Sequence, residues 1–387
     1  MLNKNRLFTP GPTALPERVR LAMARDMIHH RKAEFKALMA GIQEPLGELF
    51  GTAQPVLPLS ASGTGAMAAA VCALFAPGNK VLVVEGGKFG MRWSEICRMH
   101  GVDVSPVVVE WGQGVEPAAV AAALDADPAL CAVLVQHSET STGAAHPVKQ
   151  LAAITRQRDV LLVVDGISAV SIMPCPMDAW GIDCLLTGSQ KGLMLPPGLA
   201  LVALSERAWN KAETVAPRNF YFNLLKERDN ALKAQTHFTS PVSLIVGLAE
   251  SLAMFTECGL DNIYRKQWAL SQMTRACMSA LGLRLFAPQS YAWGLTSVLL
   301  PAGVAATDLL ARAAEDYGAF FAAGPDEYKQ RMVRIGHMGW LDYGDMAAGL
   351  RAFARSFTAC GGHIGCRNYL EQALDAYDGA LQNAYPQ

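Results

Sequence analysis

Charge is scarce in this sequence, and the little that is present balances. Charged residues make up 17% of the 387 residues, and 33 Lys and Arg face 34 Asp and Glu, for a formal net charge of −1. A near-neutral chain has no general attraction for nucleic acid or for an anionic membrane surface, so neither partner is expected. A run of 18 apolar residues is also missing, so no membrane span is predicted.

Cysteine motifs are missing as well. The nine cysteines are odd in number and scattered, and no two form a CxxC pair. This usage predicts reduced thiols in a cytoplasmic protein rather than a disulfide framework or a zinc site. The adjacent His29 and His30 do not converge on one ion if they lie on a helix, so no metal site is predicted. A Pro/Gly turn at residues 10–12 stands where a secretory signal would have its apolar core, so no signal peptide is expected.

Apolar residues, in contrast, are abundant. They make up 51% of the chain, enough for a large core in what we expect to be two domains, with apolar surface left for a subunit contact.

Two apolar runs each lead into a chemically capable side chain. Val160–Val164 is followed by Asp165, and Cys184–Leu186 is followed by a polar segment that ends at Lys191. Unbroken runs of this kind are typical of parallel strands that are covered on both faces. Open α/β sheets bind ligands beyond the carboxyl ends of their strands, so Asp165 and Lys191 are expected at one site.

An amine and a carboxylate in this arrangement suggest pyridoxal phosphate. A lysine amine can form a Schiff base with the cofactor aldehyde. A carboxylate beside the pyridine nitrogen keeps it protonated, so that the ring acts as an electron sink. From the strand pattern alone, it is equally possible that Asp165 is an ordinary strand-end aspartate and Lys191 a solvated lysine, without a cofactor.

Two glycine-containing segments could hold other parts of such a cofactor. Residues 60–65 precede an apolar helix, and a helix start of small residues suits a phosphate; a plain N-cap by Ser62 or Thr64 is the alternative. Phe89 follows a short strand and lies among glycines, which favours a ring stacked on the cofactor over an ordinary core phenylalanine.

Strands and helices alternate along the first two thirds of the chain, which predicts an α/β fold with a doubly wound, mostly parallel sheet. The sequence predicts an extended arm over residues 1–15, a large domain over 16–258 and a smaller C-terminal α+β domain over 259–387. The expected elements are helices at 16–27, 66–75, 148–158 and 242–258, and strands at 80–84, 131–135, 160–164, 184–186, 199–204, 297–300 and 332–335. Residues 219–233 are expected to be a polar surface excursion.

Several motifs together resemble one family. TGSQKGLMLPPG around Lys191, VVDGISAV around Asp165 and HSETSTG around Thr140 are similar to the cofactor segments of the class V PLP-dependent aminotransferases, in the alanine–glyoxylate and serine–glyoxylate group. FTPGPT, SGTGAM, GGKFGMRW and RIGHMG also have counterparts there, so the resemblance covers nearly the whole chain. It implies PLP fold type I.

The resemblance also implies site residues. Lys191 and Asp165 would be catalytic, Arg334 would bind the substrate carboxylate through its guanidinium fork, and Gly11 would line the substrate mouth. The implied contacts to pyridoxal 5'-phosphate are Ser62, Gly63, Thr64, Phe89, Thr140, Asp165, Gln190, Lys191 and Thr239. Thr239 would reach the phosphate of the other subunit of a homodimer with shared active sites.

The implied reaction is a ping-pong transfer of an amino group from a small amino acid to a 2-oxo acid such as glyoxylate or pyruvate. Two alternatives remain. A PLP lyase or cysteine desulfurase shares the fold, but the latter needs a cysteine shortly before the arginine, and none occurs between Cys277 and Cys360. The second alternative is a non-catalytic relative that kept the fold. The presence of Asp165, Lys191 and Arg334 together argues against it. His137 is as typical of a buried strand-end histidine as of a catalytic one.

Overall fold

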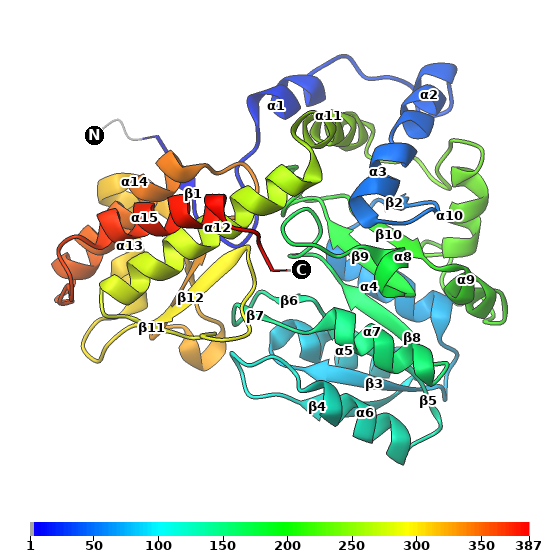
Figure 1. Cartoon of the computed structure of the whole chain (residues 1–387). Helices are drawn as coiled ribbons and strands as arrows, with labels where there is room; N and C mark the ends of the chain where they lie inside the picture. The colour runs from blue at the N-terminus through cyan, green and yellow to red at the C-terminus, as the bar shows by residue number, and fades with distance from the viewer. Residues whose placement is uncertain (1–3, 387) are drawn as a thin grey trace.

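The computed structural model describes residues 4–386 and contains two separate larger sheets (Figure 1). Residues 1–3 of the predicted arm and residue 387 of the predicted small domain lie outside the described residues. The larger sheet has seven strands and the smaller one four. A short hairpin, β6 (Ser138–Glu139) with β7 (Ala144–Ala145), extends from the large sheet.

The large sheet is mostly parallel. Its order is β2 (Leu57–Leu59), β10 (Ala200–Leu204), β9 (Cys184–Gly188), β8 (Leu161–Asp165), β5 (Leu130–Gln136), β3 (Lys80–Glu85) and β4 (Asp103–Val108). Strands β9, β8, β5, β3 and β4 pair in parallel, and β10 is antiparallel to both of its neighbours. The carboxyl ends of the parallel strands therefore meet at one edge, where ligands of such sheets bind.

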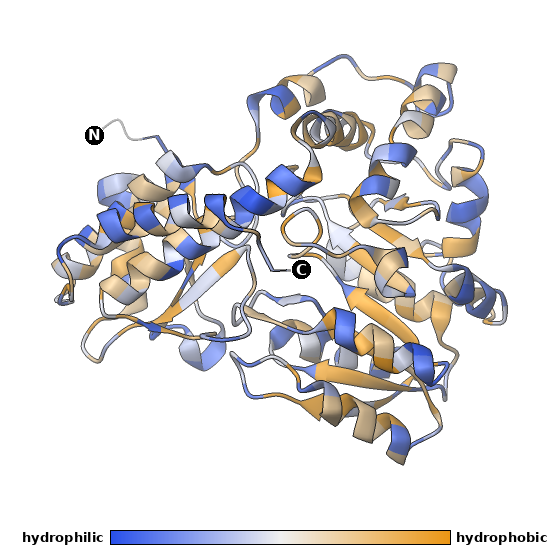
Figure 2. Cartoon of the chain, in the orientation of Figure 1, coloured by the Kyte–Doolittle hydropathy of each residue, from blue (hydrophilic) through white to orange (hydrophobic). Residues whose placement is uncertain are grey.

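Both faces of this sheet are covered, which explains why its strands are continuous apolar runs. Side chains alternate, so that Leu82 and Val84 of β3 join one core and Val81 and Val83 the other. One core packs under α2 (Ala33–Gly41), α3 (Gln43–Phe50), α6 (Pro117–Ala126), α7 (Val148–Gln157), α8 (Met177–Trp180) and α11 (Val242–Cys258). The other packs under α4 (Gly63–Leu74), α5 (Lys88–Met99), α9 (Glu206–Glu213) and α10 (Leu224–Ala231). Figure 2 shows these strands as hydrophobic.

The small sheet is antiparallel and is packed against helices. Its order is β11 (Arg284–Leu285), β12 (Leu295–Leu299), β15 (Met332–Gly336) and β14 (Ala322–Ala323). Its core includes residues of α12 (Leu260–Ala280), α13 (Ala306–Tyr317), α14 (Tyr343–Ala359) and α15 (Tyr369–Gln382). The prediction of an α/β fold with a smaller α+β part is thus confirmed. The exact division at 258/259 stays a prediction; it falls at Gly259, where α11 and α12 meet at 89°.

Within residues 4–386, no single helix is long and apolar enough to cross a membrane, and α11 with α12 has the length and composition to do so only as a bent pair.

Most predicted elements agree with the structure to within a few residues, and one expectation was incomplete. Residues 219–233, expected to be a polar surface excursion, are mostly exposed or half-buried, but they also contain α10, whose Leu224 is buried in the core beneath α4. The local charge pattern did not show that one apolar face of this segment packs inward. The first predicted helix is also shorter than expected and ends as α1 (Glu17–Met23).

The predicted arm is extended and packs on the small sheet region of its own chain. Its strand β1 (Arg6–Leu7) pairs in parallel with β13 (Ala319–Phe320). Phe8 is fully buried and stacks on Phe321 at 5.3 Å between ring centroids. The next residues approach β15 so closely that a Cβ on Gly336 would lie 2.2 Å from the Thr9 carbonyl oxygen. The arm thereby leads the chain from the small sheet region toward the carboxyl edge of the large sheet.

Candidate active site

Asp165 and Lys191 lie at the ends of neighbouring strands. Asp165 is the last residue of β8, and Lys191 follows β9, which pairs with β8 in parallel. Both side chains are buried, with exposed fractions of 4% and 9%. The Ile167 amide donates to Asp165 Oδ1 at 2.8 Å. The structure therefore brings together the carboxylate and the amine that the sequence predicted at one site.

Burial brings the proton affinities of these two groups toward each other. It raises the pKa of Asp165, opposed by the Ile167 hydrogen bond, Lys191 and Arg92 and assisted by the nearby Glu139 charge, and the net pKa is about 7. Burial also lowers the pKa of Lys191 to about 8, assisted by the positive charge of Arg334 and opposed by Asp165. Both groups can therefore exchange protons near neutral pH, as acid–base catalysis requires.

The N-terminal arm passes directly over the lysine side chain. Lys191 Nζ donates to the Pro10 carbonyl oxygen, and Thr13 Oγ1 donates to the Lys191 carbonyl oxygen at 2.9 Å. Gly11 has a φ of +111°, and a Cβ there would lie 2.6 Å from Lys191 Nζ. The positive φ favours glycine at position 11, and a Cβ there would displace the end of the Lys191 side chain.

The predicted phosphate end is the start of α4. Ser62 is the N-cap residue, its side chain makes no capping hydrogen bond, and Gly63 and Thr64 form the first turn. A Cβ on Gly63 would lie 2.4 Å from Ile167 Cδ1, which places this helix start beside the end of β8. A Cβ on Gly188 would lie 3.0 Å from Gln190 Oε1 and 3.5 Å from the Gly63 nitrogen. Ser62, Gly63, Thr64 and Gln190 are thus gathered near Asp165.

Phe89 is held by the buried carboxylate of Glu139. Glu139 Oε2 accepts the amides of Phe89 at 3.1 Å and Gly90 at 3.0 Å, both in the first turn of α5. Its Oε1 accepts the Ser141 amide at 3.0 Å. Glu139 thus joins its own loop to the helix that carries Phe89.

Thr140 and Arg334 also meet. The Thr140 hydroxyl lies 2.7 Å from that of Ser168, and its carbonyl oxygen accepts Arg334 Nη1 at 3.0 Å. Arg334, on β15, donates its Nε to the Ala323 carbonyl oxygen at 2.8 Å. These two bonds engage two of the five guanidinium N–H groups and fix its plane, while the others remain for a ligand. Within the described part of the chain, Arg334 forms no salt bridge.

Thr239 is placed differently from the other predicted contacts. It is exposed, and its hydroxyl lies 3.3 Å from His30 Nε2. No hydrogen bond within residues 4–386 joins it to another predicted cofactor contact. The nearby Thr236 is buried and donates its hydroxyl to the Phe238 carbonyl oxygen at 2.7 Å.

His137 is fully enclosed, and burial lowers its pKa to about 3. Its ring lies edge-on to Trp180, with 5.7 Å between ring centroids. This environment is that of a neutral core histidine.

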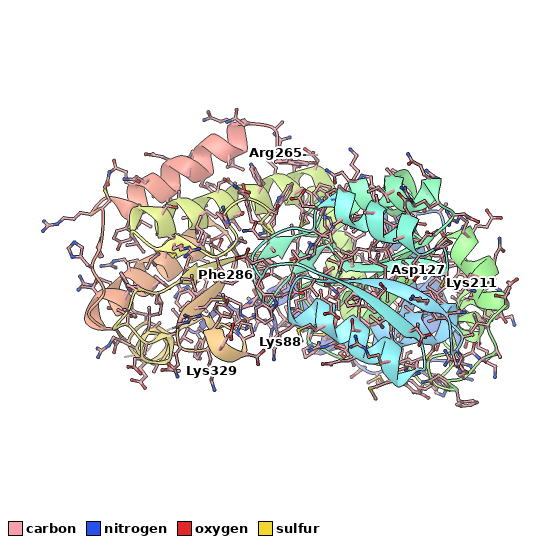
Figure 3. The ribbon with its side chains drawn as sticks, turned by 90° about the horizontal axis from the view of Figure 1, so that it is seen from below. Lys88, Asp127, Lys211, Arg265, Phe286 and Lys329 are labelled. Carbon is pink, nitrogen blue, oxygen red and sulfur yellow. The ribbon has the colours of Figure 1, made fainter. Side chains whose placement is uncertain are left out.

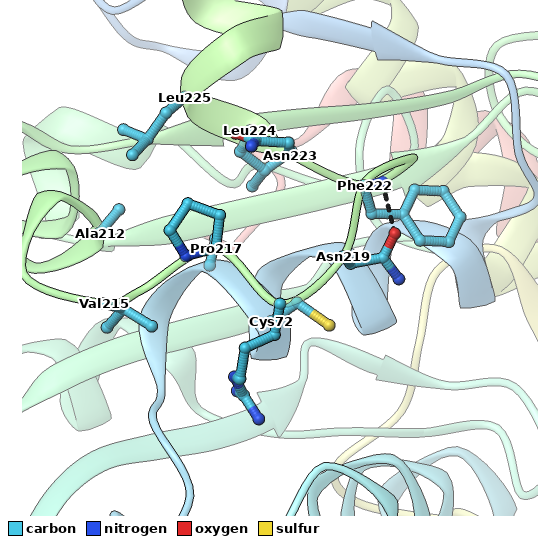
Figure 4. A pocket seen from close by; sticks show the side chains of 11 residues that line it. Cys72, Ala212, Val215, Pro217, Asn219, Phe222, Asn223, Leu224 and Leu225 are labelled. Carbon is cyan, nitrogen blue, oxygen red and sulfur yellow. Dashed lines mark hydrogen bonds between the residues drawn. The ribbon is translucent and has the colours of Figure 1, made fainter.

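The large and small sheet regions also meet at the edge of the site. Lys88 Nζ lies 2.6 Å from Asp326 Oδ1, and Figure 3 shows Lys88 at this junction, near Phe286 and Lys329. A hollow lies along α4 beneath residues 212–225 and is lined by Cys72 and Phe222 among others (Figure 4). It includes none of the predicted site residues.

The residues present fit pyridoxal phosphate. Asp165 is a buried carboxylate without an ion-pair partner in the described chain, which suits a protonated ring nitrogen. Gln190 Oε1 is buried without a hydrogen-bond partner there and lies beside the α4 start, where backbone amides suit a phosphate. Sequence reasoning missed Arg92 at this end; its spacing of three residues from Phe89 on a helix was the available signal.

Known proteins resemble this chain over most of its length. The family described as Aminotransferase class-V matches residues 7–337. The chain is 38% identical to the small subunit of soluble hydrogenase from Synechococcus sp., covering 91% of this chain and 92% of that one. It is 35% identical to serine–glyoxylate aminotransferase from Methylorubrum extorquens, covering 88% and 87%. The structure of pyridoxamine–pyruvate aminotransferase from Mesorhizobium loti superposes with a TM-score of 0.93 at 25% identity, covering 97% and 98%.

We expect Asp165→Asn to make the stability of the cofactor-free protein less sensitive to pH. The folded-state pKa of about 7 lies above the ordinary value of 3.8, so the folded state resists losing this proton. Stability is therefore lost as the pH rises between about 4 and 7, by up to about 4 kcal/mol, and asparagine removes this loss. The free energies of unfolding in urea at about pH 4 and about pH 8 measure this pH-dependent loss of stability. Asp103→Asn, at an exposed site in β4, is the control; equal pH dependence in wild type and Asp165→Asn would contradict the assignment.

Proposed function

The chain belongs to the aminotransferase class-V family and is a PLP-dependent transaminase, and on that premise we propose its substrates and the roles of its residues. The proposed reaction moves the amino group of a small amino acid, of the alanine or serine type, to glyoxylate or pyruvate. The single observation that supports it most is that Asp165 and Lys191 lie at the ends of neighbouring strands of the large sheet, and that Arg334 reaches the Thr140 loop beside them from the small sheet. A non-catalytic relative would have no use for these three groups together, and a cysteine desulfurase would need a cysteine shortly before Arg334, where none occurs.

We propose that Lys191 is the group that moves protons. Bound PLP supplies an aldehyde for the amine and a ring that accepts electrons. With a pKa of about 8, Lys191 Nζ is neutral in a substantial fraction near neutral pH, so it can take a proton from the α-carbon of the donor and return it. Asp165 would hold the ring nitrogen in its protonated form. The buried setting excludes water from both groups.

We propose that Arg334 selects and orients the donor. Its guanidinium is held by two carbonyl oxygens, one from the small sheet region and one from the Thr140 loop. A fixed planar fork binds a carboxylate in two parallel hydrogen bonds and sets the direction of the α-carbon. Gly11 would leave space for the substrate beside Lys191. The contacts of Ser62, Gly63, Thr64, Phe89, Thr140 and Gln190 with the cofactor are part of the same proposal.

We also propose a homodimer with shared active sites and a cytoplasmic location. Thr239 lies on an exposed face with Phe220, which is 74% exposed, and Tyr221, which is 44% exposed. Burial of these rings against a second chain would carry Thr239 toward the partner's phosphate site. All nine cysteines are free, which is typical of a reducing compartment.

The function is tested first at Lys191. Incubation with PLP followed by borohydride should attach the cofactor covalently to the wild-type chain and not to Lys191→Ala, as read by mass spectrometry. Lys191→Ala should also reduce the transamination of alanine or serine with glyoxylate or pyruvate by a factor of at least about 10⁴, because no neighbouring amine replaces it. Lys149→Ala, on the exposed side of α7, should label and react as wild type. A labelled Lys191→Ala chain would overturn the assignment, and an unlabelled, inactive wild type would overturn the function.

Arg334→Ala should raise the KM of every amino-acid donor by roughly 30-fold or more, because a buried charge-assisted contact to the carboxylate is lost. PLP affinity should change little, since the proposed phosphate and ring contacts remain. Steady-state kinetics with a panel of alanine, serine and aspartate donors measures the KM. Fluorescence titration measures the PLP affinity. Arg284→Ala, on the same small sheet, is the control. An unchanged KM would place the substrate carboxylate elsewhere.

The shared site predicts a specific result with mixed dimers. Sedimentation should give the mass of two chains, and Thr239→Ala should weaken PLP affinity several-fold. When Lys191→Ala and Thr239→Ala chains are mixed, each hybrid dimer should hold one site with both residues intact. Wild-type PLP affinity should then return on the chain that carries Thr239→Ala. A monomer, or hybrids without this recovery, would contradict the shared site.

A further inference from the structure

Arg92 has no role among the predicted cofactor contacts, yet it touches two of them. It lies on α5 three residues after Phe89, so the two side chains share one face of the helix. Its guanidinium carbon is 4.7 Å from the centroid of the Phe89 ring. Its Nη1 donates to the Thr64 hydroxyl at 3.1 Å, at the start of α4. One side chain thus joins the residue predicted at the cofactor ring to a residue predicted at the phosphate.

These two contacts use the specific geometry of a guanidinium. A planar cation can lie over an aromatic ring and still donate hydrogen bonds in its own plane, which an ammonium cannot do. Glu139 fixes the backbone of Phe89 from the other side by accepting its amide at 3.1 Å. The Phe89 ring is therefore constrained both through its backbone and through its face.

Arg92 has no ion-pair partner in the described chain. Across residues 4–386 no carboxylate lies within salt-bridge distance of it, and its charge acts on the buried Asp165 only from farther away. It lies beside the start of α4, whose free amides are also electropositive. The side chain is only partly exposed, so solvent does not fully replace an anion. Two positive features therefore converge at Thr64, which favours a ligand with a strong negative charge such as a phosphate dianion.

We propose that Arg92 is a positioning residue for pyridoxal phosphate, which holds the Phe89 ring and the Thr64 hydroxyl in one arrangement and adds positive charge at the phosphate end. This rests on the proposed cofactor site. It assigns Arg92 no contact with the reacting atoms. It also explains why a half-buried arginine is placed between two helix starts without an acidic partner.

Two variants separate the charge from the geometry. Arg92→Met keeps much of the side-chain volume and removes the charge and the donors, whereas Arg92→Lys keeps the charge and N–H donors but loses the planar guanidinium. Arg98→Met, on the exposed last turn of the same helix, is the matched control. Equilibrium dialysis gives the dissociation constants of PLP and of pyridoxal, which lacks the phosphate. The visible circular dichroism of the bound cofactor reports its fixed orientation without relying on activity.

Arg92→Met should weaken PLP binding by about 10- to 100-fold and pyridoxal binding by less, because both a charge-assisted hydrogen bond and a cation–π contact are lost. Arg92→Lys should recover part of the PLP affinity but show a reduced dichroic signal, and Arg98→Met should match wild type. If Arg92→Met does not fold, the circular dichroism of PLP bound to Arg92→Lys, compared with wild type, tests the proposed positioning role. Wild-type affinity and dichroism in the variants would overturn the inference. Failure of the wild type to bind PLP would instead overturn the proposed function.

Discussion

The structure depends on one arrangement, in which a carboxyl group and an amine share the same desolvated edge of a parallel sheet. Burial disfavours the charged form of each, so the pKa of Asp165 rises and that of Lys191 falls. Such a pair is costly without a ligand, because neither group is fully compensated by the protein. The buried apolar strands on both sides of β8 and β9 provide the stability that allows it. A bound cationic ring nitrogen would restore the ionised form of the carboxylate.

The remaining site residues come from elements that are far apart in sequence but fixed to one another. The hairpin loop near Thr140 is bonded to α5 through Glu139 and to β15 through Arg334. The start of α4 is bonded to α5 through Arg92. Each functional side chain is thus held by a second group whose own position is determined by packing. Rigid placement of this kind lowers the entropic cost of bringing substrate and amine together.

The sequence was informative where chemistry follows a local pattern. Apolar runs predicted β8 and β9 to within two residues, and α11 was predicted with both of its ends. The motifs around Lys191 and Asp165 indicated the cofactor before any contact was known. The role of Arg92 was not predictable, because its bond to Thr64 depends on how α4 and α5 lie together. The inward face of α10 was missed since Leu224 lies in a segment with many charges. Thr239 is exposed in the single chain, so its predicted phosphate contact stays a prediction.

The N-terminal arm joins the small sheet region to the amine itself. The Phe8 carbonyl oxygen accepts the Gly336 amide at 2.6 Å, and two residues later the Pro10 carbonyl oxygen accepts Lys191 Nζ. A displacement of β15 would therefore also move residues 8–10 and draw the Pro10 carbonyl oxygen away from Lys191 Nζ. Arg334 belongs to the same strand, so if it binds the substrate as proposed, a shift of β15 on binding would also weaken the contact that holds Lys191.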